Sequence, residues 1–547
     1  MSPPKTDDPA QPGSVSAART ANRLRRLPIP TALEALYLLG GVVLALVYAW
    51  WIDDAFIYFR YVDNLLFLRV GLVYNAGEYV EGYSSPFWLL LLVPLRALGL
   101  DWPAIVRGVG IASYLVFGLL LVALNRRLSP PGPRVNFPLA ALSFSYGVLC
   151  YFTSGLETPA LQAAAAAYAL FVVAPGSPAL SLFLGVTPLI RPELLVPLLL
   201  AAAWSRLRTG RMPWVLFGSA LVSLGGWGLV RVVYYAELLP NTFYLKNGFD
   251  PEQGWLYLWD TASTYRVVPV ALLLLAAAIV MRRSRLELHL CERGVLLLLA
   301  VSVAAYVVAI GGDARHYRYL AFPFCLAVAA TAGIPEAFLA RFLQGSRRRW
   351  ASALLGLAIA AGAFSAVPPE LDRHPITGRA EHRMLNGIND ADVHRRDPSL
   401  APEAWEERAT PSAMRAYREL HPRFVYRDTV SKAWCAEAYR LFDRRVVQSF
   451  GLTDAFLARM RVAPLPEDRP SHKHGLIPLS EELATFLRGR EELEPGIFRL
   501  AVEGGTAPAW VASNLARVET IAHKVYNRHA LLENLELSLA FPPRIVP

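Results

Sequence analysis

The sequence predicts an α-helical membrane protein with many spans, and three observations support this fold class. Of its 547 residues, 54% are hydrophobic, and the mean hydropathy of +0.34 is too high for an ordinary soluble domain. Apolar runs of membrane-spanning length recur between residues 32 and 367. Arginines gather in alternate loops between these runs, as in a multi-pass topology. We therefore attribute the net charge of +10 to membrane orientation and expect the lipid bilayer, and no nucleic acid, as a partner.

Composition divides the chain into three regions. Residues 1–31 are polar and rich in Pro, Ser and Arg, and we expect a disordered cytoplasmic segment. Residues 32–367 carry the apolar runs and are predicted to form the transmembrane domain. Residues 368–547 are charged, interrupted by prolines and without a run of spanning length, which predicts a small extracytoplasmic domain of mixed α/β structure.

Eleven spans fit the alternation of apolar runs and arginine-rich loops. Pro86–Leu100 is excluded from them because it is short and contains Pro94 and Arg96, so we expect an interfacial helix there. With the N-terminus inside, the loop after the first span and the C-terminal region both lie outside the cytoplasmic membrane. The predicted spans are 32–50, 104–124, 137–152, 157–174, 178–190, 192–205, 213–234, 264–281, 293–310, 317–336 and 350–367.

In the C-terminal region the patterns are shorter. Helices are predicted at Pro402–Leu420, with a restart at Pro411, and at Lys432–Asp443 and Glu481–Arg490. Strands are predicted at Arg445–Phe450 and Ile497–Val502.

Two adjacent carboxylates, Asp53 and Asp54, follow the first span directly, within Trp51-Ile-Asp-Asp-Ala-Phe-Ile-Tyr-Phe-Arg60. Charges at a membrane-helix exit are costly unless they have a function, although solvation of a helix end is the simpler explanation. A Gly-Leu-Val-Tyr-Asn turn at 71–75 and Glu-Gly-Tyr-Ser-Ser-Pro-Phe-Trp at 81–88 follow in the same loop.

Other predicted external loops carry further charged residues. Glu157 begins a helix and is either a partner of the helix dipole or a second acid. Arg191 and Glu193 form either a structural ion pair or part of a sugar pocket. Lys246, in Leu-Pro-Asn-Thr-Phe-Tyr-Leu-Lys, either reaches toward the membrane surface or binds a phosphate. The segment Gly311-Gly-Asp-Ala-Arg-His-Tyr-Arg318 could hold a phosphate and sugar hydroxyls.

These segments together resemble the GT-C superfamily of membrane glycosyltransferases, and within it the AftB-like, terminal β-(1→2)-arabinofuranosyltransferase family. Gly451–Arg459 and Arg469–His472 resemble the same family, with Ser471 in place of a glycine and, in the earlier motif, Leu245 in place of an alanine. The resemblance implies that an aspartate of the first external loop is the catalytic base, which maps to Asp53 or Asp54. It also implies a second acid, which maps to Glu157. Within the matching motifs, the expected substrate-binding residues are Arg60, Glu81, Tyr83, Asn241, Tyr244, Lys246, Asp313, Arg315, His316 and Arg318. Arg191 and Glu193, the charge pair outside those motifs, are expected to join them.

The expected function is transfer of a sugar, D-arabinofuranose by the resemblance, from a polyprenyl-phosphate donor to a glycan or glycoconjugate. The sequence has no Walker A loop and no Rossmann glycine pattern for a soluble nucleotide, which agrees with a donor held in the membrane. A divalent metal at Asp53 or Asp54 is left open, and the four cysteines match no zinc or redox motif. The alternatives are transfer of mannose or another sugar to protein or lipid, a lipid or polysaccharide transporter, and a scaffold that displays a carbohydrate-binding domain.

Overall fold

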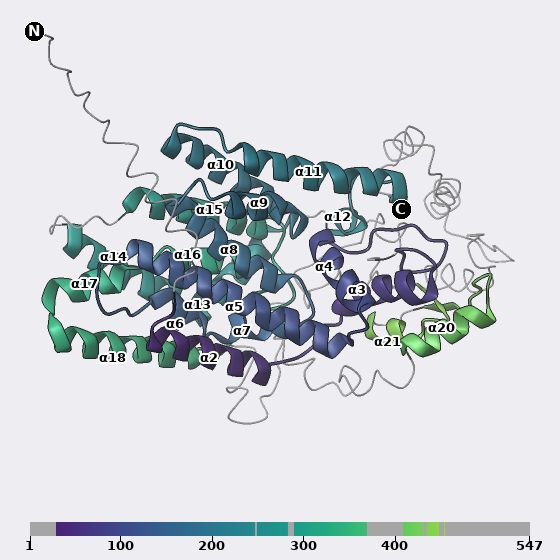
Figure 1. The fold of residues 1–547 in the computed structure, drawn as a ribbon, viewed down its shortest axis with the longest axis horizontal. Coiled ribbons are helices and arrows are strands. Elements are labelled where there is room, and N and C mark those ends of the chain that lie inside the picture. Colours follow the sequence, from purple (N-terminus) through teal and green to yellow (C-terminus); the bar gives the residue numbers. More distant parts are fainter. Residues whose placement is uncertain are drawn as a thin grey trace, which may run out of the picture.

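The computed structural model describes residues 29–246, 249–282, 289–368, 409–427, 429–431, 435–447 and 453. Within these ranges the protein is almost entirely helical (Figure 1). Up to residue 368 the elements are α2 (Ala32–Val47), α3 (Ala55–Asp63), η2 (Asn64–Leu68), α4 (Pro86–Ala97), α5 (Trp102–Leu128), α6 (Phe137–Leu142), α7 (Tyr146–Leu149), η3 (Cys150–Thr153), α8 (Thr158–Val173), α9 (Pro178–Val186), η4 (Thr187–Leu189), η5 (Pro192–Leu194), α10 (Leu195–Thr209), α11 (Trp214–Val230), η6 (Arg231–Tyr235), α12 (Asn241–Lys246), α13 (Pro251–Thr264), α14 (Val267–Arg282), α15 (Leu290–Ala309), η7 (Arg318–Leu320), α16 (Ala321–Ala329), α17 (Ile334–Phe342) and α18 (Gly345–Phe364). The later elements are α20 (Pro411–Leu420), β1 (Thr429–Ser431), α21 (Cys435–Arg440) and β2 (Arg445–Val447).

Four helical stretches in the described part are long and apolar enough to cross a membrane, and shorter apolar helices accompany them, as expected for a multi-pass membrane protein. The full set of eleven spans stays a prediction. The four stretches are Trp102–Leu128, Trp214–Tyr235, Leu290–Ala309 and Arg318–Phe342, and the shorter helices are Ala32–Val47, Pro86–Ala97, Thr158–Val173 and Pro178–Leu189.

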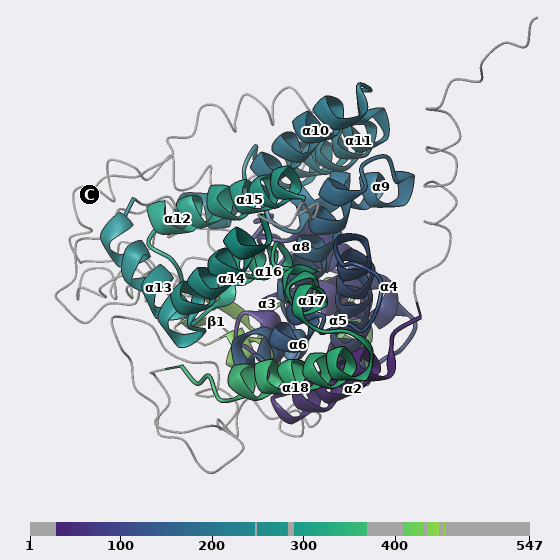
Figure 2. The same cartoon turned by 90° about the vertical axis from the view of Figure 1, so that its left-hand side faces the viewer.

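Helix α8 occupies the middle of the bundle (Figure 2). Its residues from Thr158 to Val172 are all buried, and many are alanines. Small side chains allow neighbouring backbones to approach closely, and α8 packs against α5, α16, α9, α15 and α10. Its N-terminal end therefore holds Glu157 in the interior, where the carboxylate is 1% exposed.

Two predicted spans are interrupted in the structure. The segment 137–152 consists of the short helices α6, α7 and η3, with a break at Ser143, whose hydroxyl accepts a hydrogen bond from Tyr114 Oη at 2.8 Å. The segment 317–336 breaks between α16 and α17, where Gly333 has φ +78°. The break leaves backbone carbonyls unpaired in an apolar region, and Arg293 donates hydrogen bonds to those of Ala330 and Ala332.

Part of the C-terminal region packs on the segment that follows α2. α20 contacts η2, and α21 contacts α3 (Figure 1). Strands β1 and β2 pair in parallel, with Thr429 opposite Arg445. α20 begins at Pro411 and β2 at Arg445, as predicted, whereas α21 is shorter than the predicted helix. The predicted elements Glu481–Arg490 and Ile497–Val502 lie outside the described residues.

Candidate active site

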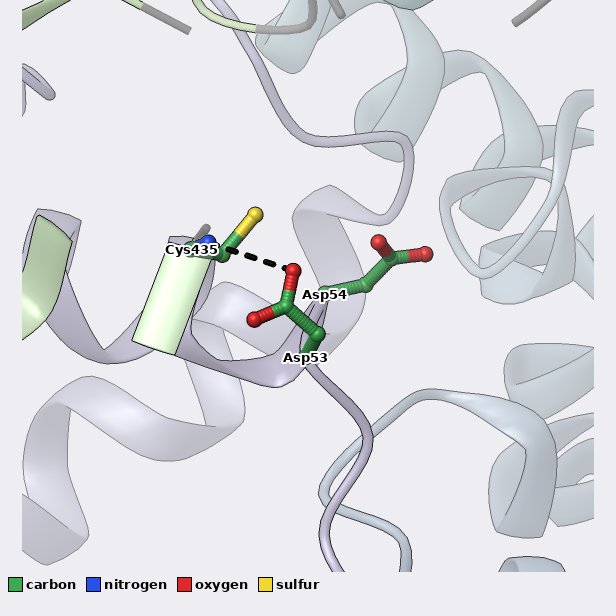
Figure 3. Close-up of side chains that lie close together, drawn as sticks. All are labelled: Asp53, Asp54 and Cys435. Carbon is green, nitrogen blue, oxygen red and sulfur yellow. Dashed lines mark hydrogen bonds between the residues drawn. The ribbon is translucent and has the colours of Figure 1, made fainter. Parts of the chain in front are cut away.

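The two adjacent aspartates precede α3 and face different surroundings. Asp53 is 8% exposed, whereas the side chain of Asp54 is 35% exposed. Figure 3 shows the Asp53 carboxylate directed toward the backbone of Cys435, while Asp54 points away from it. One of the two acids is therefore enclosed by protein and the other is open to a substrate.

Asp53 caps the N-terminus of α21. Its Oδ2 accepts a hydrogen bond from the Cys435 N–H at 3.1 Å, and its Oδ1 accepts one from the Ala436 N–H at 2.9 Å. These N–H groups have no partner within a helix, so the carboxylate satisfies them. Burial raises the pKa of Asp53 and the Asp54 carboxylate adds to the rise, against the lowering effect of the backbone donors.

Arg60, one α3 residue that was expected to bind substrate, holds the other end of α21. Its guanidinium makes five hydrogen bonds, which is the number of N–H donors the group has. The acceptors are the carbonyls of Tyr74, Ala438, Leu441 and Arg444 and the side-chain oxygen of Asn75. All five N–H donors of Arg60 are therefore used within the protein, and the prediction that this residue binds substrate stays a prediction.

Asp54 forms a charged cluster with Arg318 and Asp313. Arg318 Nη1 donates to Asp54 Oδ2 at 3.0 Å and lies 3.5 Å from Asp313 Oδ2. The loop that carries Asp313 and Arg318 is unusual, because Tyr317 adopts φ +68° and ψ −37°. At Gly312, φ is +73° and an added Cβ would lie 2.4 Å from the Tyr257 ring, so glycine is required there. Such backbone strain often occurs where a loop must present functional side chains.

A second charged group adjoins the first through Tyr319. Arg191 Nη1 lies 3.6 Å from Glu157 Oε1, and Arg191 Nε lies 3.0 Å from Glu193 Oε1. The guanidinium carbons of Arg191 and Arg318 lie 4.1 and 5.7 Å from the Tyr319 ring centroid. The structure therefore brings Asp54, Glu157, Arg191, Glu193, Asp313 and Arg318 into one region, which we call the acidic centre.

Glu157 has an unusual environment within this acidic centre. Its Oε2 is buried and accepts no hydrogen bond from the residues that the structure describes. The hydroxyl of Tyr58, on α3, lies in the same environment and accepts a hydrogen bond from the Ser85 N–H at 3.1 Å. Burial and the Glu157 carboxylate raise the pKa of Tyr58, so this phenol stays protonated.

His316 is held in a separate network. Its Nδ1 hydrogen-bonds to Asp260 Oδ2, and its Nε2 lies 3.3 Å from the Tyr265 hydroxyl. Both ring nitrogens therefore have partners, and the imidazole is 1% exposed. The backbone carbonyl of Arg315 accepts a hydrogen bond from Tyr257 Oη at 2.8 Å. These contacts hold the loop 311–318, and the prediction that His316 contacts substrate stays a prediction.

The other expected substrate-binding residues form a third group. Trp227 Nε1 donates to Glu81 Oε1 at 2.9 Å, and Arg231 forms a two-point ion pair with the same carboxylate. The Glu81 carbonyl accepts the Asn241 N–H at 3.0 Å. Tyr83 Oη and Tyr235 Oη are 2.9 Å apart, and Tyr244 Oη donates to Glu237 Oε2 at 3.3 Å. Lys246 ends α12, and its side chain lies outside the described part.

The residues present fit a divalent metal poorly. One group in the described residues places three possible ligand atoms within 4.8 Å, namely those of Asp53, Asp54 and Cys435. Both Asp53 oxygens already accept backbone N–H groups, and Asp54 pairs with a guanidinium. A thiol is also a poor ligand for Mg²⁺ or Ca²⁺, which prefer oxygen atoms. The chemistry of the site is therefore assigned to the protein's own side chains.

Two curated proteins match the chain. One is the terminal beta-(1->2)-arabinofuranosyltransferase of Corynebacterium glutamicum, 27% identical over 335 residues, which cover 52% of this chain and 48% of that protein. The other is the protein of the same name from Mycobacterium tuberculosis, 29% identical over 270 residues, which cover 42% of this chain and 41% of that protein. This chain is similar to terminal beta-(1->2)-arabinofuranosyltransferases. The resemblance inferred from the motifs is thereby confirmed.

The similarity to these arabinofuranosyltransferases has a limited extent. The chain spans about half the length or less of the curated relatives it matches. No family model matches the chain, and no solved structure matches it.

Several residues around the acidic centre were missed by sequence reasoning. Tyr58 lies four residues after Asp54, so helical spacing predicts that it faces the same side of α3. Tyr319 follows Arg318 directly, but a single aromatic residue in a largely apolar chain does not indicate a place in a functional site. Asp260 and Cys435 lie far in sequence from their partners, and no pattern in the sequence indicates those contacts.

Proposed function

We propose that this protein is a membrane glycosyltransferase that moves a D-arabinofuranosyl group from a polyprenyl-phosphate donor to a glycan or glycoconjugate acceptor. The site would face the outside of the cytoplasmic membrane, as the distribution of arginines favours. The similarity to arabinofuranosyltransferases supports the sugar. The observation that supports acid–base chemistry is the placement of Asp54. Its carboxylate is partly exposed and accepts a hydrogen bond from Arg318, whereas the charged groups around it are buried.

In the proposed reaction, Asp54 is the general base. An acceptor hydroxyl oxygen attacks the anomeric carbon, the new C–O bond forms, and the bond from that carbon to the phosphate oxygen breaks. The hydroxyl proton passes to Asp54, and the electron pair of the broken bond leaves with the polyprenyl phosphate. General-base help of this kind accelerates a reaction by roughly 10²–10⁴-fold.

Arg318 is the proposed partner of the phosphate. Its Nη1 faces Asp54 and Asp313, while its Nε is buried and has no hydrogen-bond acceptor among the described residues. A guanidinium binds phosphate oxygens strongly through its planar N–H groups. Donor binding at this side chain would place the leaving group beside the base. Glu157 is proposed as the second acid of the site, and Lys246 remains a predicted phosphate ligand.

An apolar cavity supports a lipid-linked donor. It has a volume of about 610 Å³ and lies among α6, α14, α15, α16 and α18, lined mainly by aliphatic side chains. Tyr265 and Phe324 belong to its wall, and both rings contact Tyr317, the residue before Arg318. A polyprenyl chain in this cavity would therefore end near the loop that carries Arg318.

The decisive experiment is a transfer assay with the purified protein in liposomes. Polyprenyl phosphates that carry arabinofuranose, mannose or glucose are each offered with a synthetic arabinan acceptor. Transfer is expected from the arabinofuranose donor alone. Transfer from another donor alone would refute the sugar assignment, and a folded protein that uses none of the donors would refute the proposed enzyme class.

A further inference from the structure

A second cluster of charged residues lies at the other end of the bundle from the acidic centre. α5 begins at Trp102, whose indole N–H contacts Tyr439 of α21 at 3.0 Å, and it ends with Arg126 and Arg127. A helix of 27 residues is roughly 40 Å long, so its two ends are a membrane thickness apart. In Figure 1 the start of α18, which also belongs to this cluster, lies far from α3 and α21.

The loop that joins α5 to α6 has a sequence suited to a fixed shape. It reads Ser129-Pro-Pro-Gly-Pro-Arg-Val-Asn136, and its three prolines restrict the backbone. Gly132 has φ +125°, and an added Cβ would lie 2.7 Å from Arg348 Nη1. That same Nη1 donates to the Pro131 carbonyl at 3.1 Å. Glycine at this position therefore lets the Arg348 guanidinium lie directly on the loop.

The two carboxylates of this region hold mainly backbone and amide groups, while Glu34 Oε2 also lies 3.7 Å from Arg126 Nη2 and Glu336 Oε2 makes no hydrogen bond among the described residues. Glu336 Oε1 accepts hydrogen bonds from the side chain of Asn125 and from two backbone N–H groups, those of Val135 and Asn136. Glu34 Oε1 accepts one from Asn136 Nδ2 at 2.8 Å, and Glu34 Oε2 accepts the Thr31 N–H at the same distance. Their negative charges hold the loop and the start of α2 in place.

The arginines, in contrast, keep buried donors without acceptors. Among the described residues, Arg126 Nε, Arg134 Nη1 and both Nε and Nη2 of Arg348 are buried and make no hydrogen bond, and neither does Ser129 Oγ. Buried donors in proteins are almost always satisfied, so such a concentration points to a bound acceptor. Burial, and then the nearby Arg126, lower the pKa of Arg134, against the raising effect of the Glu34 and Glu336 carboxylates.

We propose that Arg126, Arg134 and Arg348 bind the phosphate of an anionic membrane phospholipid. Guanidinium groups are the side chains best suited to bidentate phosphate recognition, and basic pockets between membrane helices bind acidic head groups. A lipid is favoured over free phosphate because α18 continues from Arg348 with Trp350 and Leu354, which are 70% and 65% exposed. Such side chains suit the interface and acyl region of a bilayer.

The test uses the purified full-length protein in a neutral detergent. Its melting temperature is measured after addition of phosphatidylglycerol, phosphatidylcholine or inorganic phosphate at matched ionic strength. Phosphatidylglycerol is expected to raise the melting temperature by about 2 °C or more, and the other two additions are not. The double variant Arg134→Gln with Arg348→Gln is expected to lose this rise.

A matched control separates a built site from general surface charge. The double variant Arg347→Gln with Arg349→Gln removes the same charge from exposed positions of α18 and should keep the full rise. An equal loss in both double variants would overturn the proposal, and so would an equal rise with inorganic phosphate in the parent protein. If the first double variant fails to fold, Arg348→Lys replaces it. Lys keeps the charge but loses the planar fork, so an unreduced rise there would also refute the site.

Discussion

Asp54 and Asp53 differ in what surrounds their carboxylates, and this difference separates their expected roles. The side chain of Asp54 is 35% exposed and accepts a hydrogen bond from Arg318, so it is accessible and placed beside a cation, as we propose for the base. Asp53 is buried and accepts hydrogen bonds from two backbone N–H groups of α21, as a helix-capping residue does. The proposed base is therefore Asp54, and Asp53 is a positioning residue.

Asparagine substitutions distinguish these roles. We expect Asp54→Asn to reduce turnover in the transfer assay by about 10²-fold or more, because an amide cannot accept the proton. Asp53→Asn should keep turnover within about tenfold, because the amide oxygen can still cap α21, although the amide NH2 cannot accept the second backbone N–H group. Asp53→Ala should lower the free energy of unfolding by about 0.5–2 kcal/mol, visible as a lower melting temperature. A catalytic loss confined to Asp53→Asn would reverse the assignment.

The candidate site was predicted from sequence only as separate pieces. The motifs identified Asp54, Asp313 and Arg318, but Asp54 and Arg318 are 264 positions apart in the sequence, which hides their contact. The prediction that Arg60 binds substrate stays a prediction, and the sequence did not indicate its hydrogen bonds to backbone carbonyls. Three of these carbonyls belong to a segment 378 to 384 residues later.

At the level of elements, α3 is the helix to which several neighbouring elements attach. Asp53 and Arg60 hold the two ends of α21. Asp63, at the end of α3, receives hydrogen bonds from Arg96 of α4, Trp102 of α5 and Tyr439 of α21. Asp53, which precedes α3, and two buried charged residues on this short helix thus join four elements. Hydropathy alone could not reveal α3, because its apolar residues are interrupted by these charged ones.

Arg60→Lys tests whether α3 holds α21. Lysine keeps the positive charge but cannot serve five acceptors, so α21 should detach more often. The thiol of Cys435, at the start of α21, is buried and should then react about tenfold faster or more with a small thiol reagent, in a Cys291→Ser background that removes the exposed cysteine. Arg69→Lys, on the exposed side of the same loop, is the control and should leave the rate unchanged. Equal reaction rates of Cys435 in both variants would contradict the conclusion that Arg60 holds α21 against α3.

For the whole molecule, the apolar runs predicted the long helices α5, α11 and α15 and the short helix α4 correctly. The interruptions within 137–152 and 317–336 were not predicted, because they depend on partners such as Tyr114 and Arg293 from other helices. Residues that the predicted topology places outside gather around the acidic centre, and those placed inside gather around Glu336 and Arg348. Membrane orientation itself stays a prediction.

Cysteine labelling tests that orientation. In the Cys291→Ser background, a cysteine at Glu252, exposed at the start of α13, should react with a membrane-impermeant reagent in intact cells. A cysteine at Ser346, exposed at the start of α18, should react only after the membrane is opened. Labelling of Ser346→Cys in intact cells would contradict the predicted sidedness, and detergent-solubilised samples of both variants control for reactivity.

The attachment of α21 to α3 also sets an order in time. The carboxylate of Asp53 accepts hydrogen bonds from N–H groups that lie 382 and 383 positions later in the chain, so these bonds cannot form until that segment has been synthesised. At 5–20 residues per second, a ribosome needs roughly 20 to 75 s to add that much polypeptide. In the predicted topology, the first loop therefore leaves the membrane with its charges hydrated during biogenesis, and it closes only after the segment that carries α21 has been translocated. Attachment of α21 to α3 would then report that export of the polypeptide has proceeded at least that far.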